Sequence, residues 1–243
     1  MKKVICIIEA RMSSTRLPGK VLKKIQGKRL LEILISRLKL SQKISKSIIA
    51  TSNKKIDQKI INFCKTKKIS FFRGSEKNVL KRVYDAAKKN KADIVIRLTG
   101  DNPLIDPKML DYMTKFFLKN KYNYVCNNGL GIESKRQVPP GLDIQIFNFN
   151  DLEKILNFVK KEKKKDLIEH PPLYFYREGK KIFKIHNIKL PKKFSILKKI
   201  RLTVDTFEDF KFISSIIEYF NKMNKKQFFT TQDLDKYLRL RSN

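Results

Sequence analysis

The chain has 243 residues, of which 41% are hydrophobic, so it can bury a core of ordinary domain size and is unlike an intrinsically disordered segment. No apolar run approaches the roughly 18 residues that cross a bilayer, and the three scattered cysteines form no CxxC pair, so we expect neither a membrane span nor a zinc site. The formal net charge of +33 is spread along the whole chain without a nucleic-acid-binding signature, so we interpret it as a solvated, lysine-rich surface and expect no nucleic-acid partner.

The first half of the chain alternates apolar, β-branched runs with stretches of helical periodicity. Strands are predicted at Val4–Ala10, Ser47–Thr51, Ile69–Phe72 and Asp93–Thr99. Helices are predicted at Leu30–Leu40, at Ile56–Thr66, after an N-cap at Ser75 as far as Asn90, and from Asp106-Pro107 onward. Strands that alternate with helices indicate right-handed βαβ units and a mostly parallel sheet, which places the chain in the α/β class.

The second half is less regular. Residues 129–141, rich in glycine, proline and charge, are predicted to form a loop. Further strands are predicted at Leu142–Phe147, Ile182–Ile188 and Arg201–Val204. Further helices are predicted at Asp151–Lys161, Leu167–Arg177, Glu208–Met223 and Thr231–Leu240.

The segment after the first predicted strand is rich in cations and small side chains. It runs from Ala10 to Lys20 and carries Arg11, Arg16 and Lys20 among hydroxyl residues and one glycine. Small residues let backbone N–H groups approach phosphate oxygens, and arginine binds such oxygens in pairs. Because ligands of open α/β sheets bind beyond the carboxyl ends of the strands, this loop is a candidate triphosphate site. A plain basic loop is the alternative interpretation.

Two aspartates follow predicted strands in distant parts of the chain. Asp101 comes after the fourth strand and Asp205 after the last. Carboxylate oxygens suit Mg²⁺, which takes one or two carboxylates together with substrate phosphates. The two side chains could therefore converge on one cation, although Asp101 could also be a simple turn residue.

Other polar residues near these motifs have structural explanations. Asp106 precedes a proline and is a good helix N-cap, and Thr206 with Asp209 matches a capping box. Asp143 interrupts a strand pattern and could simply face outward. His170 is a lone histidine, and such a residue is more often structural than catalytic.

The motifs resemble those of a known family. The string EARMSSTRLPGKVL at 9–22 resembles the N-terminal signature of the CMP-sugar-acid synthetases, which include CMP-Kdo and CMP-sialate synthetases, and is most similar to the SpsF branch, named for spore coat polysaccharide biosynthesis. Further matches to that branch follow in the same order over essentially the whole chain: FRGS at 72–75, RLTGDNPLIDP at 97–107, GLD at 141–143, EH at 169–170 and TVDTFED at 203–209.

This resemblance implies a GT-A-like, Rossmann-like nucleotidyltransferase fold in a single domain over 1–243, with about 127–195 as a less regular portion for acceptor binding and dimerisation. It implies a Mg²⁺-dependent homodimer that transfers CMP from CTP to a sugar or sugar-acid hydroxyl, releases pyrophosphate and serves surface polysaccharide synthesis. Scattered cysteines favour the cytoplasm. Another nucleoside triphosphate, a phosphorylated or phosphonate acceptor, and a nucleic-acid-binding protein remain alternatives.

The resemblance also implies roles for individual residues. Catalysis is expected of Lys20, Arg11, Arg16 and Asp101. Metal binding is expected of Asp101 and Asp205. Contacts to CTP are expected of Ala10, Arg11, Ser13, Ser14, Arg16, Lys20, Arg73, Arg97 and Asp101. Acceptor contacts are expected of Asn127, Asp143, Glu169 and His170.

Overall fold

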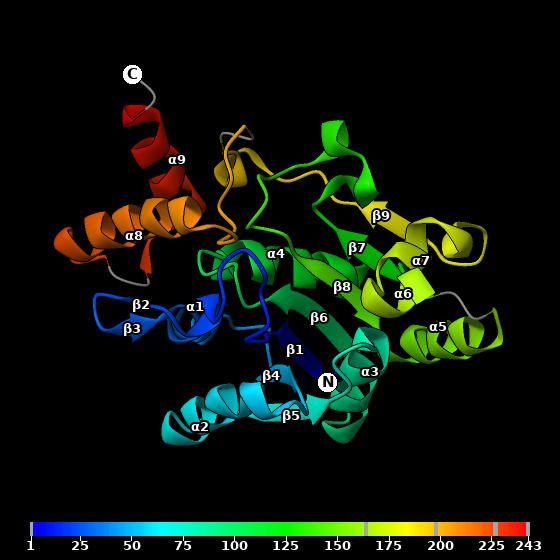
Figure 1. Ribbon diagram of the computed structural model, residues 1–243. Helices are drawn as coiled ribbons and strands as arrows, with labels where there is room; N and C mark the ends of the chain where they lie inside the picture. The colour runs from blue at the N-terminus through cyan, green and yellow to red at the C-terminus, as the bar shows by residue number, and fades with distance from the viewer. Residues whose placement is uncertain (1, 163–164, 197–198, 226–227, 242–243) are drawn as a thin grey trace.

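The computed structural model describes residues 2–162, 165–196, 199–225 and 228–241, and a seven-stranded sheet lies at its centre (Figure 1). The strands of this sheet are β1 (Val4–Glu9), β4 (Lys46–Ser52), β5 (Phe71–Gly74), β6 (Ile94–Thr99), β7 (Tyr124–Cys126), β8 (Gln145–Asn148) and β9 (Ile185–Asn187). Their order across the sheet is β5-β4-β1-β6-β8-β7-β9. Only β8 runs antiparallel to its neighbours. The predicted α/β class with a mostly parallel sheet is confirmed.

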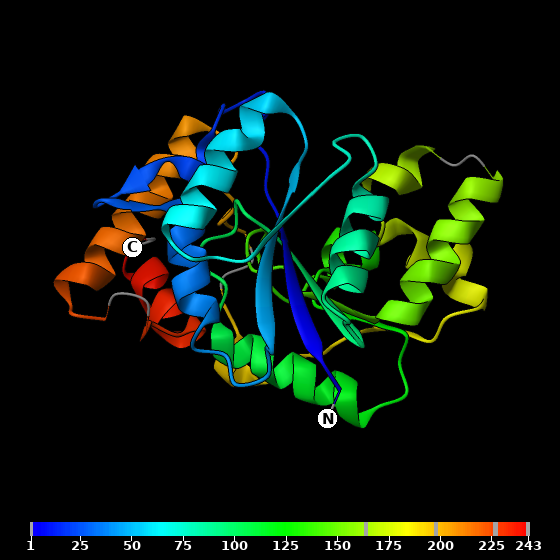
Figure 2. The same cartoon turned by 90° about the horizontal axis from the view of Figure 1, so that it is seen from below.

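Helices cover both faces of this sheet (Figure 2). One face carries α1 (Leu30–Leu38), α2 (Gln58–Thr66), α4 (Pro107–Lys119), α8 (Phe207–Lys222) and α9 (Thr231–Leu240), and beside them lies a small hairpin of β2 (Lys24–Ile25) and β3 (Lys28–Arg29). The other face carries α3 (Val79–Lys89), α5 (Phe149–Glu162), α6 (Lys165–Glu169) and α7 (Leu173–Tyr176). No helix in these described ranges is long and apolar enough to cross a membrane.

The central strand β1 is apolar because both of its faces are buried. Cys6 and Ile8 pack into the core beneath α1 and α4, whereas Ile5 and Ile7 pack into the core beneath α3 and α5. All four side chains are fully buried. A strand covered on both faces has a continuous apolar sequence, which is why this segment could be identified from its composition.

Buried polar contacts fasten α9 to the rest of the molecule. Asp106 caps α4, as predicted, and its other oxygen accepts hydrogen bonds of 2.7 Å from both the backbone N–H and the hydroxyl group of Thr231. Arg37 on α1 is 1% exposed and donates to the carbonyl of Phe229 at 3.0 Å. Its Cζ lies 3.9 Å from the centre of the Phe229 ring. The start of α9 is therefore held against α1 and α4.

Two predicted elements are wrong. The helix expected at Leu167–Arg177 is divided into α6 and α7 at Pro171-Pro172, because proline supplies no N–H to a continuing helix. The strand expected at Arg201–Val204 is an extended segment outside the sheet. It alternates like a strand because it packs on one side against the core.

Three smaller differences concern element ends. The N-cap of α3 is Asn78, whose side chain accepts from the backbone of Lys81, whereas Ser75 accepts from the backbone of Asn78 one turn earlier. Strand β8 begins at Gln145, later than predicted. The three-residue strand β7 was not expected, since its run is too short to give a periodic pattern.

Candidate active site

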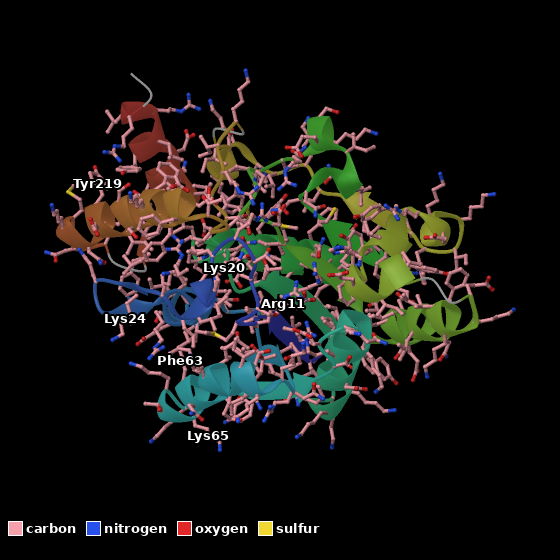
Figure 3. The ribbon with its side chains drawn as sticks, viewed as in Figure 1. Arg11, Lys20, Lys24, Phe63, Lys65 and Tyr219 are labelled. Carbon is pink, nitrogen blue, oxygen red and sulfur yellow. The ribbon has the colours of Figure 1, made fainter. Side chains whose placement is uncertain are left out.

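A cavity of about 440 Å³ opens at the carboxyl ends of β1 and β6. The loop of residues 10–20, called the 10–20 loop below, forms one wall, and α3 contributes Val79 and Arg82 to another. Asp205, just before α8, also lines it. Figure 3 shows the labelled Arg11 and Lys20 near the middle of the molecule, beside the end of β1. The cavity thus lies at the edge of the sheet where ligands of open α/β sheets bind.

The ammonium group of Lys20 joins two carboxylates in this cavity. Its Nζ lies 2.6 Å from Oδ2 of Asp101 and 2.7 Å from Oδ1 of Asp205. Gly19 adopts a left-handed backbone with φ of 68°, which starts the short 3-10 turn Lys20–Leu22 and sets the direction of the lysine. The two aspartates that were expected to converge do lie together, and the group between them is the ammonium of Lys20.

The position of Asp205 is fixed by its neighbours in the chain. Asp209 accepts from the backbone N–H groups of Asp205 and Thr206, which completes the predicted capping box of α8. The backbone N–H of Val204 donates to the carbonyl of Asp101 at 2.9 Å. This last bond ties the two carboxylate-bearing segments directly to each other.

The segment that carries Asp205 can approach only because position 141 is a glycine. Gly141 has φ of 109°, and a Cβ atom on it would lie 2.3 Å from the carbonyl carbon of Leu202. The backbone N–H of Leu202 donates to the carbonyl of Pro140 at 2.7 Å. Any larger residue at 141 would push the 201–205 segment away from the cavity.

Asp205 is surrounded by positive charge. Besides Lys20, Arg16 lies 3.1 Å from Oδ2, and the Arg201 guanidinium contacts the same oxygen. Arg201 was not predicted, because its strand-like context concealed its orientation. Three cations therefore pair with a carboxylate that is only 8% exposed.

The carboxylate pair also fits a divalent cation. Oδ1 of Asp101 is buried and has no hydrogen-bond partner in the described part of the chain, so this oxygen is available to coordinate a cation. The described residues contain no cluster of three or more histidine, cysteine or acidic side chains arranged for a metal. Two hard oxygen donors without further protein ligands suit Mg²⁺, which completes its octahedron with phosphate oxygens and water.

Two acidic side chains that the sequence analysis missed hold the 10–20 loop. Asp57 is fully buried, accepts from the backbone N–H of Met12 at 2.7 Å, and also binds the Ser52 hydroxyl. Glu76 accepts from the Ser13 hydroxyl at 3.1 Å. Asp57 precedes a helix and was therefore indistinguishable in the sequence from an ordinary helix-start residue.

A second ion pair lies along the sheet at the rim of the cavity. Arg97 on β6 binds Glu9 on β1 through two hydrogen bonds of 2.7 and 2.8 Å, and it donates to Gln145 on β8 at 2.8 Å. Burial by itself would lower the pKa of Arg97, but the Glu9 carboxylate beside it raises that pKa above its ordinary value. Arg97 therefore stays charged within the sheet.

Most of the residues expected at the nucleotide line the cavity. They are Ala10, Arg11, Ser13, Ser14, Arg16, Lys20, Arg97 and Asp101. Arg73 is placed elsewhere: it is exposed and donates to the side chain of Gln58 and to the carbonyl of Asn53.

The residues expected at the acceptor are more dispersed. Glu169 and His170 line the same cavity. Asp143 lines an adjoining hollow of about 160 Å³ and pairs with Arg136, and burial raises the pKa of its carboxyl group. Asn127 is fully buried, and its amide is used by backbone groups of Leu142 and Ile144.

Arg82 is the cavity residue that the sequence analysis overlooked. Arg82 is 3% exposed, although most of the basic residues of this lysine-rich chain lie at the surface. The signal was its place on α3, where Val79, Val83 and Ala86 form an apolar stripe at helical spacing that position 82 completes. An arginine on such a stripe faces inward.

A Rossmann-like α/β sheet with a basic loop after its first strand and two aspartates meeting beside that loop defines a nucleotidyltransferase. The comparison with known proteins is more specific: the chain belongs to the cytidylyltransferase family, whose model matches residues 5–242.

Two relatives and one solved structure match the chain over most of its length. The chain is 36% identical to the spore coat polysaccharide biosynthesis protein SpsF of Bacillus subtilis over 90% of this chain and 88% of that protein. It is 39% identical to an uncharacterized protein, MJ1063, of Methanocaldococcus jannaschii over 91% of this chain and 86% of that protein. A solved cytidylyltransferase of Leptospira borgpetersenii superposes with a TM-score of 0.86 at 33% identity, covering 100% of this chain and 96% of that one. The resemblance stated from the motifs is confirmed.

Proposed function

We propose that this cytidylyltransferase transfers CMP from CTP to a hydroxyl group of a sugar or sugar acid, in the synthesis of a surface polysaccharide. The observation that carries the proposal is the Lys20 ammonium between Asp101 and Asp205 in a cavity walled by the 10–20 loop. The free thiols, all buried, agree with a cytoplasmic setting.

In the proposed reaction the acceptor hydroxyl attacks the α-phosphorus of CTP and pyrophosphate leaves. Catalysis of this kind depends on positioning and on neutralising charge. Arg11 has no hydrogen-bond partner among the described residues, so its guanidinium is available to phosphate oxygens, and Arg16 and Lys20 can stabilise the charge of the departing pyrophosphate. Mg²⁺ bound by Asp101 and Asp205 would supply further charge neutralisation at the phosphates.

The decisive experiment is a panel of CTP, UTP, GTP and ATP, each tested with several 2-keto-3-deoxy sugar acids and with Mg²⁺ or EDTA, while pyrophosphate is measured. We expect release with CTP, a sugar acid and Mg²⁺ together. Lys20→Ala and Asp205→Ala should each lower turnover at least about 100-fold, as removal of one preorganised electrostatic contact does. Asp235→Ala on α9, which removes a surface carboxylate paired with Arg239, is the control. Near-normal turnover in both site variants would contradict the proposal.

A phosphorylated or phosphonate acceptor is the second candidate. The hollow beside the main cavity is lined by Arg97 and Arg136, and arginine is well suited to phosphate. A phosphate there would compete with the carboxylates that these arginines already bind, those of Glu9 and Asp143. The same panel separates the candidates when phosphorylated sugars and phosphonates are added as acceptors.

We also propose that the chain forms a homodimer through its portion at about 127–195. Support comes from two large apolar side chains in that portion, Ile132 and Ile182, which are 45% and 69% exposed. Sedimentation equilibrium should give twice the chain mass. An Ile182→Asp variant should shift the equilibrium toward monomer, and a monomeric wild type would refute the proposal.

A further inference from the structure

The guanidinium group of Arg82 is only partly used by the protein. Its Nη1 donates to the carbonyl of Ser75 and to that of Glu76, the latter at 3.3 Å. Its Nε is buried without a partner, and Nη2 has none among the described residues. A buried donor left unpaired costs free energy, so this edge of the guanidinium calls for a ligand.

The side chain of Arg82 is held in this orientation by close packing. A Cβ atom on Gly74 would lie 2.9 Å from Cγ of Arg82, so the aliphatic part of the arginine rests directly on the end of β5. The bonds from Nη1 fix the other end. The unpaired Nε–Nη2 edge is therefore a preorganised pair of donors at a residue that lines the cavity.

The cavity has two chemically different ends. Asp101, Asp205 and Lys20 supply the charges that suit a metal-bound triphosphate. Val79 and Arg82 enter from α3, which packs on the opposite face of the sheet from α8 (Figure 2). The second end places the apolar side chain of Val79 beside the guanidinium edge of Arg82, and this combination suits the flat face and polar edge of a nucleobase.

We propose that Arg82 is the residue that selects cytosine, by donating from Nε and Nη2 to the adjacent acceptors N3 and O2 of the base. This inference rests on the proposed use of CTP. Uracil carries a hydrogen on N3, so a uridine nucleotide would oppose one donor with another. A guanidinium edge that faces two neighbouring acceptors discriminates between bases by about 10- to 100-fold.

The test compares the binding of CTP, UTP and 3-deaza-CTP, in which a C–H replaces N3, by titration calorimetry. Wild-type protein should bind 3-deaza-CTP about 10-fold more weakly than CTP, because one hydrogen bond is lost. In Arg82→Met the difference between CTP and 3-deaza-CTP should vanish and the preference for CTP over UTP should fall about 10- to 100-fold. Lys81→Met, an exposed neighbour on α3 paired with Asp85, is the matched control and should keep both differences.

The outcomes separate base selection by Arg82 from its structural role of holding the backbone carbonyl groups of Ser75 and Glu76. A purely structural role would weaken CTP, UTP and 3-deaza-CTP equally, and that result would overturn the inference. Equal binding of CTP and 3-deaza-CTP by wild-type protein would overturn it without any variant. Wild-type protein that binds no CTP at all would instead refute the proposed function on which the inference depends.

Discussion

Replacing Lys20 with methionine should destabilise the protein in a way that Mg²⁺ reverses. Methionine keeps most of the side-chain volume and removes the ammonium group. The oxygens that this group joins, on Asp101 and Asp205, each lie within 2.7 Å of Nζ and hence about 5 Å apart at most. With an effective dielectric constant of about 20, two negative charges at about 5 Å repel each other by about 3 kcal/mol.

Arg16 and Arg201 remain beside Asp205 and offset part of this repulsion. We therefore expect Lys20→Met to lower the free energy of unfolding by about 2–3 kcal/mol. Added Mg²⁺ should restore most of this loss, because a divalent cation can take the place of the ammonium group. It should change the wild type much less, because there the carboxylates are already neutralised.

The assay is urea unfolding of both proteins with EDTA and with saturating Mg²⁺. Lys67→Met is the control, because Lys67 also pairs with a carboxylate, that of Glu32 at 2.8 Å, but is 46% exposed. An exposed pair contributes about 0–1 kcal/mol. A Lys20→Met protein as stable as the wild type in EDTA, or an equal gain from Mg²⁺ in both, would refute the reasoning.

Three further predictions test other parts of the molecule. Gly141→Ala should lower turnover at least about 10-fold while the chain stays folded by circular dichroism, because the added Cβ atom displaces Leu202 and with it Asp205; unchanged turnover would show that this close approach is dispensable. Burial would raise the pKa of Asp233, but bonds from Lys225 and Thr230 bring it down to about 2, so the carboxylate stabilises the fold above pH 4 and this contribution is lost as pH falls toward 2. Between pH 4 and pH 2 the free energy of unfolding should therefore fall by about 1–2 kcal/mol less in Asp233→Asn than in the wild type. Finally, binding to duplex DNA at 150 mM salt should be no tighter than about 10 μM despite the net charge of +33, and a nanomolar affinity would favour the nucleic-acid alternative.

The features that could be predicted from the sequence are those with a local cause. An apolar run buried on both faces identified β1, and short polar patterns identified the caps at Asp106 and Thr206. The meeting of Asp101 and Asp205 could be predicted because parallel strands end at one edge of a sheet. The prediction was correct although the segment before Asp205 is not a strand, since its backbone still bonds to that of residue 101.

The features that could not be predicted depend on contacts between distant segments. Arg201 is one cation among 56 basic residues, and only the packing of the 201–205 segment places its guanidinium against Asp205. Asp57 holds the backbone of Met12 across 45 positions of sequence. A hydrogen bond between segments so far apart produces no periodic pattern in the amino-acid sequence.

The three buried cysteines allow local unfolding of the chain to be followed by thiol labelling. Burial raises the pKa of Cys64 to about 12 and that of Cys6 and Cys126 above its usual range, so the folded protein presents almost no thiolate at neutral pH. Alkylation requires the thiolate, so a cysteine can react only after the structure around it has unfolded. Cys6 lies on the central strand, Cys126 near one edge and Cys64 on a covering helix, so the labelling rates of the three sites would distinguish fraying of one layer from loss of the whole core.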